Sequence, residues 1–240
     1  MSTDQSFTAE NLDIYLRDLA KEYKKHGGKY MKAEIILIGG AAILANYGFR
    51  QMTYDMDALI EASSAIDDAI NAVGNRHGLP VGWLNSDFRN TKSYSPKLRQ
   101  YSQHYKQFYG ILEVRIVTAE YLVAMKLVSS RQYKNDLSDI IGIIAEHRRS
   151  GTPLTYEQID TAVCNLYGSW ESIPNSSVGF IKSALLEEDI ESLYVKSRES
   201  EIENRDALIE FDAEYPGSIQ ENNISELIAV AKKRQQEKRS

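Results

Sequence analysis

The chain has 240 residues, of which 42% are hydrophobic and 26% are charged. These fractions suit a globular protein with a sizeable core, and they exclude a disordered chain and a collagen-like repeat. The single cysteine, Cys164, excludes an internal disulfide and a multi-cysteine zinc site. No apolar stretch is long enough to span a membrane, and the N-terminus lacks the pattern of a secretory signal. We therefore expect a soluble, cytoplasmic protein.

The net charge of −6 is unevenly distributed along the chain. Residues 151–240 hold 17 acidic and 9 basic residues, whereas residues 1–150 hold 17 acidic and 19 basic ones. The first part is therefore able to meet an anionic ligand. The acidic second part suits either solvent or a basic partner.

In chain order, hydrophobic spacing predicts a first helix capped by Thr8 and ending near Gly27-Gly28. A continuous apolar run predicts a buried strand over 35–38, which Gly39 and Gly40 end. The next elements are a helix over 41–47, a strand over 56–60, a helix over 65–78, a strand over 111–117, and helices over 119–129 and 134–146. Residues 79–110 show no clear period and are expected to form a long loop.

The Gly-Thr-Pro segment at 151–153 is the clearest boundary in the chain. Beyond it the spacing predicts only helices, the first with a capping box of Thr155 and Gln158 and the last starting near Asn223. The sequence thus predicts an α+β (α/β) fold. A small mixed sheet flanked by helices forms a domain over 1–150, and an all-helical domain covers 151–240.

Two elements of the first domain carry candidate chemistry. Gly39 and Gly40 join a buried strand to a helix, where the missing β-carbons and the helix dipole favour a phosphate group. Asp55 and Asp57 lie two residues apart where the next strand begins, so their carboxylates share a face. Such carboxylates repel each other unless a divalent cation such as Mg²⁺ joins them. Taken singly, the glycines equally suit a simple turn, and the aspartates a solvated strand entry.

Together these elements, with Thr53 before Asp55, resemble the signature of the nucleotidyltransferase superfamily with the polymerase-beta-like fold. A second block, AEYLVAMKLVSSRQYKNDLSDI at 119–140, resembles one in uncharacterised bacterial nucleotidyltransferases and in the toxin nucleotidyltransferases of abortive-infection toxin–antitoxin systems. The resemblance covers about residues 30–145. It implies an enzyme that uses a nucleoside triphosphate, with Mg²⁺ or Mn²⁺ as cofactor, and whose protein partner is an antitoxin.

The resemblance also implies roles for individual residues. Lys126 contacts the triphosphate. Asp139, in preference to Asp136, is the acidic residue later in the chain that completes the site. From the residues alone, Lys126 is equally a lysine with a buried stem, and both aspartates suit the first turn of a helix. By resemblance, the metal ligands are Asp55 and Asp57, and the nucleotide-binding residues are Gly39, Gly40, Thr53, Lys126, Arg131 and Asp139.

Glu113 is a candidate third catalytic carboxylate. It lies on the more polar face of the 111–117 strand, while Leu112 and Val114 point toward the core. In this position it is either a third metal ligand or the base of the reaction. The alternative is a surface glutamate paired with Arg115, which we favour slightly.

The acceptor is indicated by a stretch without acidic residues between Asp87 and Glu113. Interleaved basic and aromatic side chains there either follow a nucleic-acid strand or form a solvated loop whose tyrosines cover the sheet. An RNA end, a small alcohol and a protein side chain are the acceptors considered. The residues are Arg89, Lys92, Lys97, Arg99, Lys106, Tyr94, Tyr101, Tyr105 and Tyr109, with a second basic run of Lys21, Lys24, Lys25, Lys29 and Lys32.

Three functions are compatible with the sequence. The first is a Mg²⁺-dependent nucleotidyltransferase, the toxin of a toxin–antitoxin pair. The second is a module of the same fold that binds a nucleotide or a partner without turnover, favoured by Ala41, where many active members have serine, and by the long 41–54 spacing. The third is a protein whose acidic helical tail docks a basic partner. The segment WLNSDF at 83–88 also resembles the bacterial family, but its residues indicate no chemistry.

Overall fold

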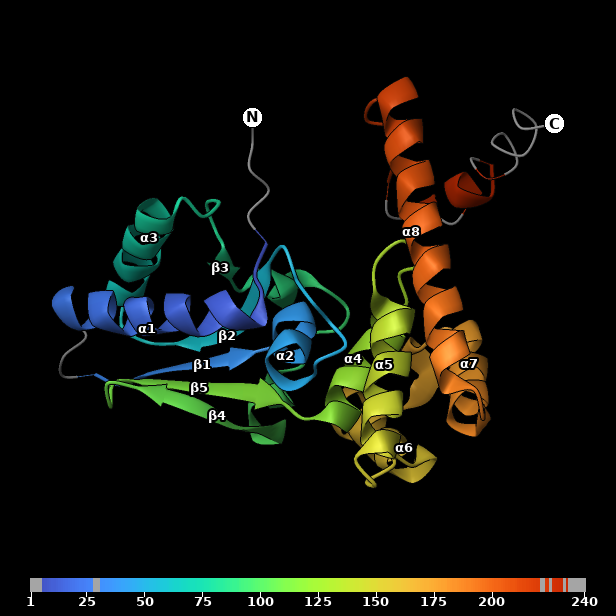
Figure 1. Cartoon of the computed structure of the whole chain (residues 1–240), viewed down its shortest axis with the longest axis horizontal. Coiled ribbons are helices and arrows are strands. Elements are labelled where there is room, and N and C mark those ends of the chain that lie inside the picture. Colours follow the sequence, from blue (N-terminus) through green and yellow to red (C-terminus); the bar gives the residue numbers. More distant parts are fainter. Residues whose placement is uncertain (1–5, 28–30, 221–222, 225, 231, 233–240) are drawn as a thin grey trace.

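The computed structural model describes residues 6–27, 31–220, 223–224, 226–230 and 232. Its centre is a five-stranded sheet with the strand order β3-β2-β1-β5-β4 (Figure 1). Two pairs, β1 with β5 and β2 with β3, are parallel, and the other two pairs are antiparallel. The strands are β1 (Ala33–Leu37), β2 (Met56–Glu61), β3 (Leu84–Asn85), β4 (Ser102–Phe108) and β5 (Leu112–Val117).

Helices flank this mixed sheet and then continue alone, which confirms the predicted α+β fold class. The first three helices are α1 (Ala9–Lys25), α2 (Gly39–Asn46) and α3 (Ala65–His77). Figure 1 shows the later ones grouped beside one end of the sheet: α4 (Ala119–Ser129), α5 (Asp136–Arg149), α6 (Tyr156–Tyr167), α7 (Asn175–Leu186) and α8 (Ile190–Glu214). Within the described ranges, no helix is long and apolar enough to cross a bilayer. The helix predicted from near Asn223 is confirmed where the structure describes it, over 226–230, and the charged end that follows lies largely outside the described residues.

The predicted caps form at two helix starts. At α1, the Thr8 hydroxyl accepts a hydrogen bond from the Asn11 backbone N–H at 3.4 Å, and the Asn11 side chain accepts one from the Thr8 N–H at 2.9 Å. Thr155 and Gln158 make the same reciprocal pair at α6. Each cap satisfies N–H groups that a helix start leaves free, an effect of about 1 kcal/mol.

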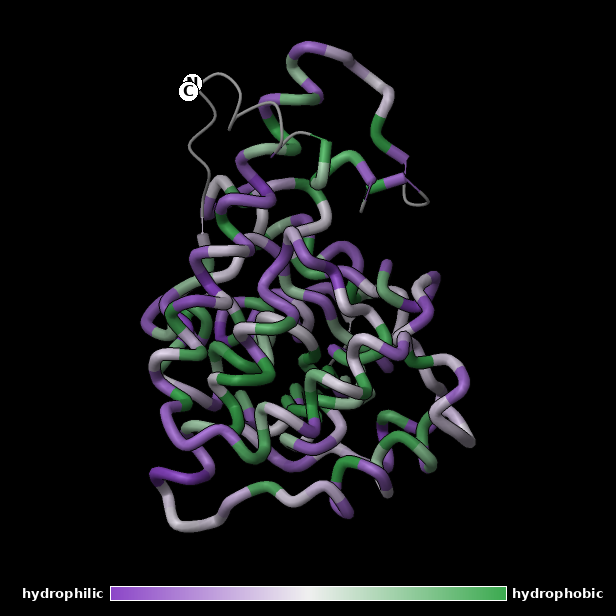
Figure 2. Tube along the Cα trace, turned by 90° about the vertical axis from the view of Figure 1, so that its right-hand side faces the viewer, coloured by the Kyte–Doolittle hydropathy of each residue, from purple (hydrophilic) through white to green (hydrophobic). Residues whose placement is uncertain are grey.

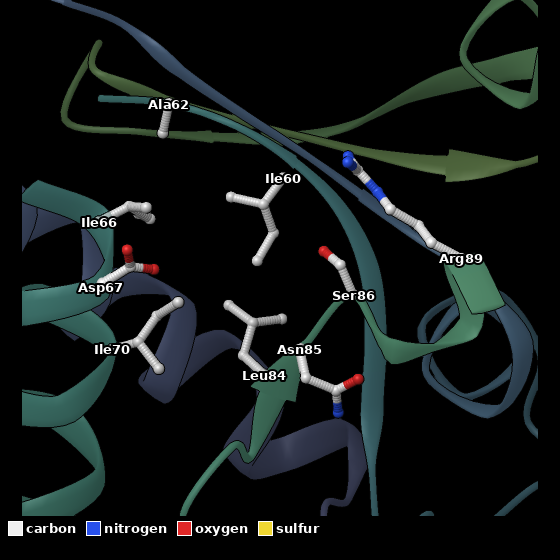
Figure 3. A pocket seen from close by; sticks show the side chains of 9 residues that line it. All are labelled: Ile60, Ala62, Ile66, Asp67, Ile70, Leu84, Asn85, Ser86 and Arg89. Atoms are coloured by element: carbon white, nitrogen blue, oxygen red, sulfur yellow. The ribbon is translucent and has the colours of Figure 1, made fainter. Parts of the chain in front are cut away.

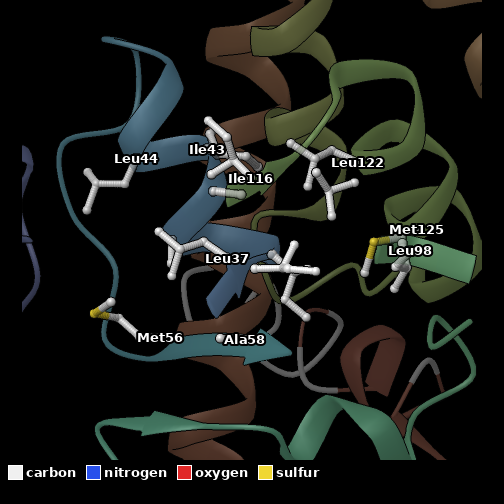
Figure 4. Close-up of a cluster of buried hydrophobic side chains, with 14 of the residues drawn as sticks. Leu37, Ile43, Leu44, Met56, Ala58, Leu98, Ile116, Leu122 and Met125 are labelled. Carbon is white, nitrogen blue, oxygen red and sulfur yellow. The ribbon is translucent and has the colours of Figure 1, made fainter. Parts of the chain in front are cut away.

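One buried hydrophobic cluster extends from the sheet into the helices. Leu37 of β1, Ile116 of β5 and Leu122 of α4 belong to it (Figure 4), as does Ile181 of α7. Hydrophobic and hydrophilic residues are interspersed along the chain trace (Figure 2), as expected where amphipathic elements pack on a shared core. Full burial of one such side chain stabilises the fold by about 1.5–3 kcal/mol. The domain boundary at 151–153 stays a prediction.

The prediction of a long loop over 79–110 is wrong. The segment contains β3, β4 and the short 3-10 helices η2 (Asp87–Asn90) and η3 (Pro96–Tyr101). β4 is an edge strand with the sequence SQHYKQF, of which only the two end residues are buried. A strand so exposed lacks the apolar alternation that reveals strands in a sequence. Two element starts also differ from expectation, since α2 begins at Gly39 and α5 at Asp136.

Candidate functional site

A cleft of about 570 Å³ lies between the sheet and the helical part of the molecule. Its walls come from the start of α2, the segment before β2, the end of α4, the loop between α4 and α5, and α8. It unites most of the residues predicted for the site. Those that line it are Gly39, Gly40, Thr53, Asp55, Asp57, Lys126 and Arg131.

The two glycines bring the backbone at the start of α2 close to Asp57 and to Thr53, which contacts Asp55. Gly39 has φ +52°, a left-handed conformation that favours glycine, and a β-carbon there would lie 3.8 Å from Asp57 Oδ2. At Gly40 a β-carbon would lie only 2.5 Å from Thr53 Oγ1 and 2.8 Å from Arg50 Nη2. The N-cap of α2, Ile38, offers no side-chain hydrogen bond to the helix. The first N–H groups of α2 are therefore suited to hold an anion in the cleft.

A short backbone pairing fixes the segment that carries Asp55. The N–H of Phe7 donates to the Thr53 carbonyl at 2.7 Å, and the N–H of Thr53 donates to the Phe7 carbonyl at 2.9 Å. The Thr53 hydroxyl then donates to Asp55 Oδ1 at 3.2 Å. Thr53 thus orients one carboxylate from a buried position.

The electrostatics of Asp57 favour a bound cation. Burial, and next the charge of Asp55, raise the pKa of Asp57, while Lys134, Arg131 and Lys126 oppose that shift. Among the described residues, no three acidic, histidine or cysteine side chains are grouped closely enough to hold a metal alone. Mg²⁺ commonly takes one or two carboxylates and completes its shell with water and substrate phosphate. The pair Asp55 and Asp57 fits that ion on this basis.

The WLNSDF segment supports the strand that carries Asp57. Its β3 pairs parallel with β2, and the Met56 N–H donates to the Trp83 carbonyl at 3.2 Å. The buried Trp83 indole N–H donates to the Ile70 carbonyl at 3.0 Å, which ties the segment to α3. Asp87 and Phe88 then reach the cleft wall. This segment, for which the sequence indicated no chemistry, aligns the start of β2.

Lys126 lies in an ion-pair network. Its Nζ is 2.8 Å from Asp136 Oδ1 and 2.8 Å from Asp139 Oδ2. Arg131 Nε lies 2.9 Å from Asp136, and Arg50 Nη1 lies 2.6 Å from Asp139. Burial lowers the pKa of Lys126, but the two aspartates outweigh it and raise that pKa overall. Burial likewise acts to raise the pKa of Asp136, but Lys126 and Arg131 hold it well below the usual range. Asp139 binds Lys126 and Arg50 without itself lining the cleft.

Glu113 is not brought to the cleft. β5 runs parallel to β1, with Glu113 opposite Glu34, whereas the cleft lies beyond Leu37 at the other end of β1. Glu113 Oε1 is 2.6 Å from His104 Nδ1. The alternative pairing with Arg115 is not observed either, because Arg115 Nε donates to the Ser102 hydroxyl at 2.9 Å. The face of the strand was correctly predicted, but its position along the sheet excludes Glu113 from this site.

The basic and aromatic stretch is largely engaged within the molecule. Lys106 pairs with Asp13, and the Tyr105 hydroxyl donates to Asp13 at 3.0 Å. Tyr101 stacks on Tyr121 with ring centroids 4.0 Å apart. Arg99 pairs with Glu34 and Glu61, and in the second run Lys29 lies outside the described residues. These contacts favour the interpretation that the tyrosines cover the sheet.

A second hollow of about 320 Å³ lies between β2, α3 and β3. Figure 3 shows Ile60, Ile66 and Leu84 around it, with Asp67 and Arg89 at its sides. It contains no carboxylate pair and no start of a helix following glycines. We therefore place the candidate site in the larger cleft.

Several cleft residues were missed by sequence reasoning. Arg50 precedes the Thr53 segment, Lys134 lies in the loop before α5, and Arg198 and Arg205 come from α8. The last two lie far along the chain, in a helix whose many charged residues are typical of a solvent-exposed helix. No local pattern distinguishes them from surface arginines, and only tertiary packing brings them to the cleft.

Comparison with known proteins gives one match. Residues 15–146, more than half of the chain, match the model of family DUF6036, described as a nucleotidyltransferase of unknown function. The chain matches no curated protein and no solved structure.

Proposed function

Because the chain belongs to the DUF6036 family of nucleotidyltransferases, we propose that its cleft transfers a nucleoside monophosphate from a nucleoside triphosphate to an acceptor hydroxyl. The observation that carries this proposal is the meeting of the α2 start with Asp55 and Asp57 in one cleft. One side offers backbone N–H groups to phosphate oxygens, and the other offers two carboxylates to a divalent cation.

In the proposed reaction the acceptor oxygen attacks the α-phosphorus in line. A bond forms between these two atoms, and the bond from the α-phosphorus to the α–β bridging oxygen breaks. Pyrophosphate leaves, and the hydroxyl proton passes to water. Mg²⁺, held by Asp55 and Asp57, would supply charge neutralisation at the phosphates. The α2 N–H groups orient the phosphate chain, and Thr53 keeps Asp55 in position.

The experiment that tests the proposal is a thermal shift with each of the four nucleoside triphosphates, with and without Mg²⁺. A ligand at a hundredfold excess over its Kd stabilises the folded state by about 2.7 kcal/mol. We expect a Mg²⁺-dependent shift with at least one triphosphate, and we expect Asp57→Asn to lose it. A protein that no triphosphate stabilises, with or without Mg²⁺, would contradict the proposal.

We extend the proposal to an RNA end as acceptor and to the role of toxin in a toxin–antitoxin pair. The support is the resemblance of the 119–140 block to toxin nucleotidyltransferases. Labelled triphosphate incubated with total RNA is expected to label a discrete RNA band, and expression of the chain is expected to arrest growth. Label that stays in a small molecule or in protein would refute the RNA acceptor.

A second candidate is a module that binds nucleotide or a protein partner without turnover. The observations that favour it are the ion pairs that occupy Lys126 and the distance of Glu113 from the cleft. Mg²⁺-dependent triphosphate binding without release of pyrophosphate, across RNA, protein and small-alcohol acceptors, would select this second function.

A further inference from the structure

Three cations of the cleft are only weakly neutralised within the described part of the chain. Lys134 makes no ion pair there. The Arg198 guanidinium donates a hydrogen bond to Asn135 Oδ1, a neutral acceptor. Arg205 pairs with its neighbour Asp206 at 3.6 Å, and the two side chains are 45% and 62% exposed. Because exposed pairs of this kind contribute little, all three charges remain available to an anion.

Lys126 lies in the opposite situation. Its ammonium is shared between Asp136 and Asp139, whose side chains are 0% and 4% exposed. Moving Lys126 toward a ligand would leave each of these buried carboxylates with one cation fewer, Asp136 with Arg131 and Asp139 with Arg50, which is an unfavourable change. Its geometry is that of a structural cation, although it borders the cleft.

The packing of α8 holds its two arginines over the cleft. Arg198 and Arg205 are seven residues apart, close to two turns, and therefore lie on one face of the helix. Next to Arg205 in the chain, Asn204 Nδ2 donates to the Gln132 carbonyl at 2.7 Å. This bond fixes the helix to the loop that also carries Lys134. The arginines are thus placed by the fold.

We infer, on the basis of the proposed function, that Arg198, Arg205 and Lys134 bind the β- and γ-phosphates of the nucleoside triphosphate. Lys126 then maintains the network beneath them. Guanidinium groups suit this task because they donate paired hydrogen bonds to phosphate oxygens. The phosphate chain would extend from the α2 N–H groups and the aspartate pair toward α8. The helical part of the chain is in this way required for nucleotide binding.

The test uses the full chain and calorimetric titration with Mg²⁺ and three probes: inorganic tripolyphosphate, the four nucleoside triphosphates and the corresponding monophosphates. Arg198→Gln and Arg205→Gln are each expected to weaken triphosphate and tripolyphosphate binding about tenfold or more. Monophosphate binding is expected to change less than threefold. The matched control is Lys196→Gln, an exposed cation on another face of α8, which should leave all affinities unchanged.

The role of Lys126 is tested by the paired variant Lys126→Gln/Asp136→Asn, which removes one charge of each sign and keeps hydrogen-bonding groups. It is expected to retain triphosphate binding within about threefold. Full triphosphate affinity in the double variant Arg198→Gln/Arg205→Gln would overturn the inference and leave the proposed function intact. Failure of the wild-type chain to bind any triphosphate would overturn the proposed function together with it.

Discussion

The carboxylate of Glu201, on α8, accepts a hydrogen bond from the Ser138 hydroxyl at 2.5 Å and another from the Ser138 backbone N–H at 3.3 Å. It also accepts one from the Leu137 N–H at 2.8 Å. The N-cap of α5, Asn135, makes no side-chain hydrogen bond to that helix. Glu201 therefore caps α5 from a helix distant in the chain and links α8 to the start of α5 beside the cleft.

The Glu201 cap predicts a pH-dependent stability. Burial raises the pKa of Glu201 from 4.5 to about 7, and the charge of Asp139 adds to that shift, against the hydrogen bonds that Ser138 and Leu137 donate. The folded state thus binds a proton that the unfolded state releases near pH 4.5. The stabilisation, about 3 kcal/mol at most, is present below pH 4.5 and is lost as the pH rises through about 7.

Chemical denaturation between pH 4.5 and 8 measures this effect. Glu201→Gln imitates the protonated acid and is expected to flatten the fall in unfolding free energy over that range. Glu199→Gln, an exposed acid on the same helix, is the control and should follow the wild-type curve. An unchanged slope in the Glu201 variant would show that other groups cause the dependence.

Asp57→Asn is expected to reduce nucleotidyl transfer by at least about a hundredfold, because charge neutralisation by a metal supplies several kcal/mol. The stability of the metal-free protein should stay within about 1 kcal/mol of wild type or rise. Burial and Asp55 raise the pKa of Asp57, so its ionised form is unfavourable in the fold. Transfer rates and thermal melts of Asp57→Asn and of Asp68→Asn, an exposed acid on α3, make the comparison. A large loss of stability would identify a structural aspartate.

Gly40→Ala is expected to destabilise the protein by about 1–3 kcal/mol and to weaken triphosphate binding. The new β-carbon would lie 2.5 Å from Thr53 Oγ1 and 2.8 Å from Arg50 Nη2, so it must displace the residues that hold Asp55 and Asp139. Gly48→Ala is the matched control, because nothing lies within 4 Å of its new β-carbon. Equal behaviour of the two variants in melts and titrations would refute the crowding at Gly40.

The parts of this fold that were predictable have strong local signals. The 35–38 run and the glycines located β1 and α2, and the aspartate spacing located the start of β2. The edge strands β3 and β4 escaped prediction because one has two residues and the other is largely exposed. The polar side chains of β4 resemble those of a loop, and two residues are too few for β3 to show a period, so only the sheet neighbours identify both as strands.

The candidate site divides in the same way. Neighbouring elements carry Gly39, Gly40, Asp55 and Asp57. These residues lie close together because the end of β1 and the start of β2 are adjacent in the antiparallel pair. Arg198 depends on how α8 docks on the 131–138 region, which no short-range pattern encodes. The Glu113 prediction failed for the same reason. A local pattern identified the correct face of β5, but the position of Glu113 relative to the cleft depends on how the sheet is assembled.

Lys126→Met tests the structural role of the network. Removing the lysine leaves Asp136 and Asp139 buried beside fewer cations, and breaking such a pair costs about 3–5 kcal/mol. Cations hold the pKa of Asp136 low, so its stabilisation is present above its unfolded pKa near 3.8 and is lost as the pH falls below it. Acid unfolding of Lys126→Met should therefore begin at higher pH than that of wild type. Lys196→Met, at an exposed position, is expected to change the unfolding free energy by less than about 0.5 kcal/mol. If Lys126→Met instead kept wild-type stability and lost triphosphate binding, Lys126 would be a ligand contact.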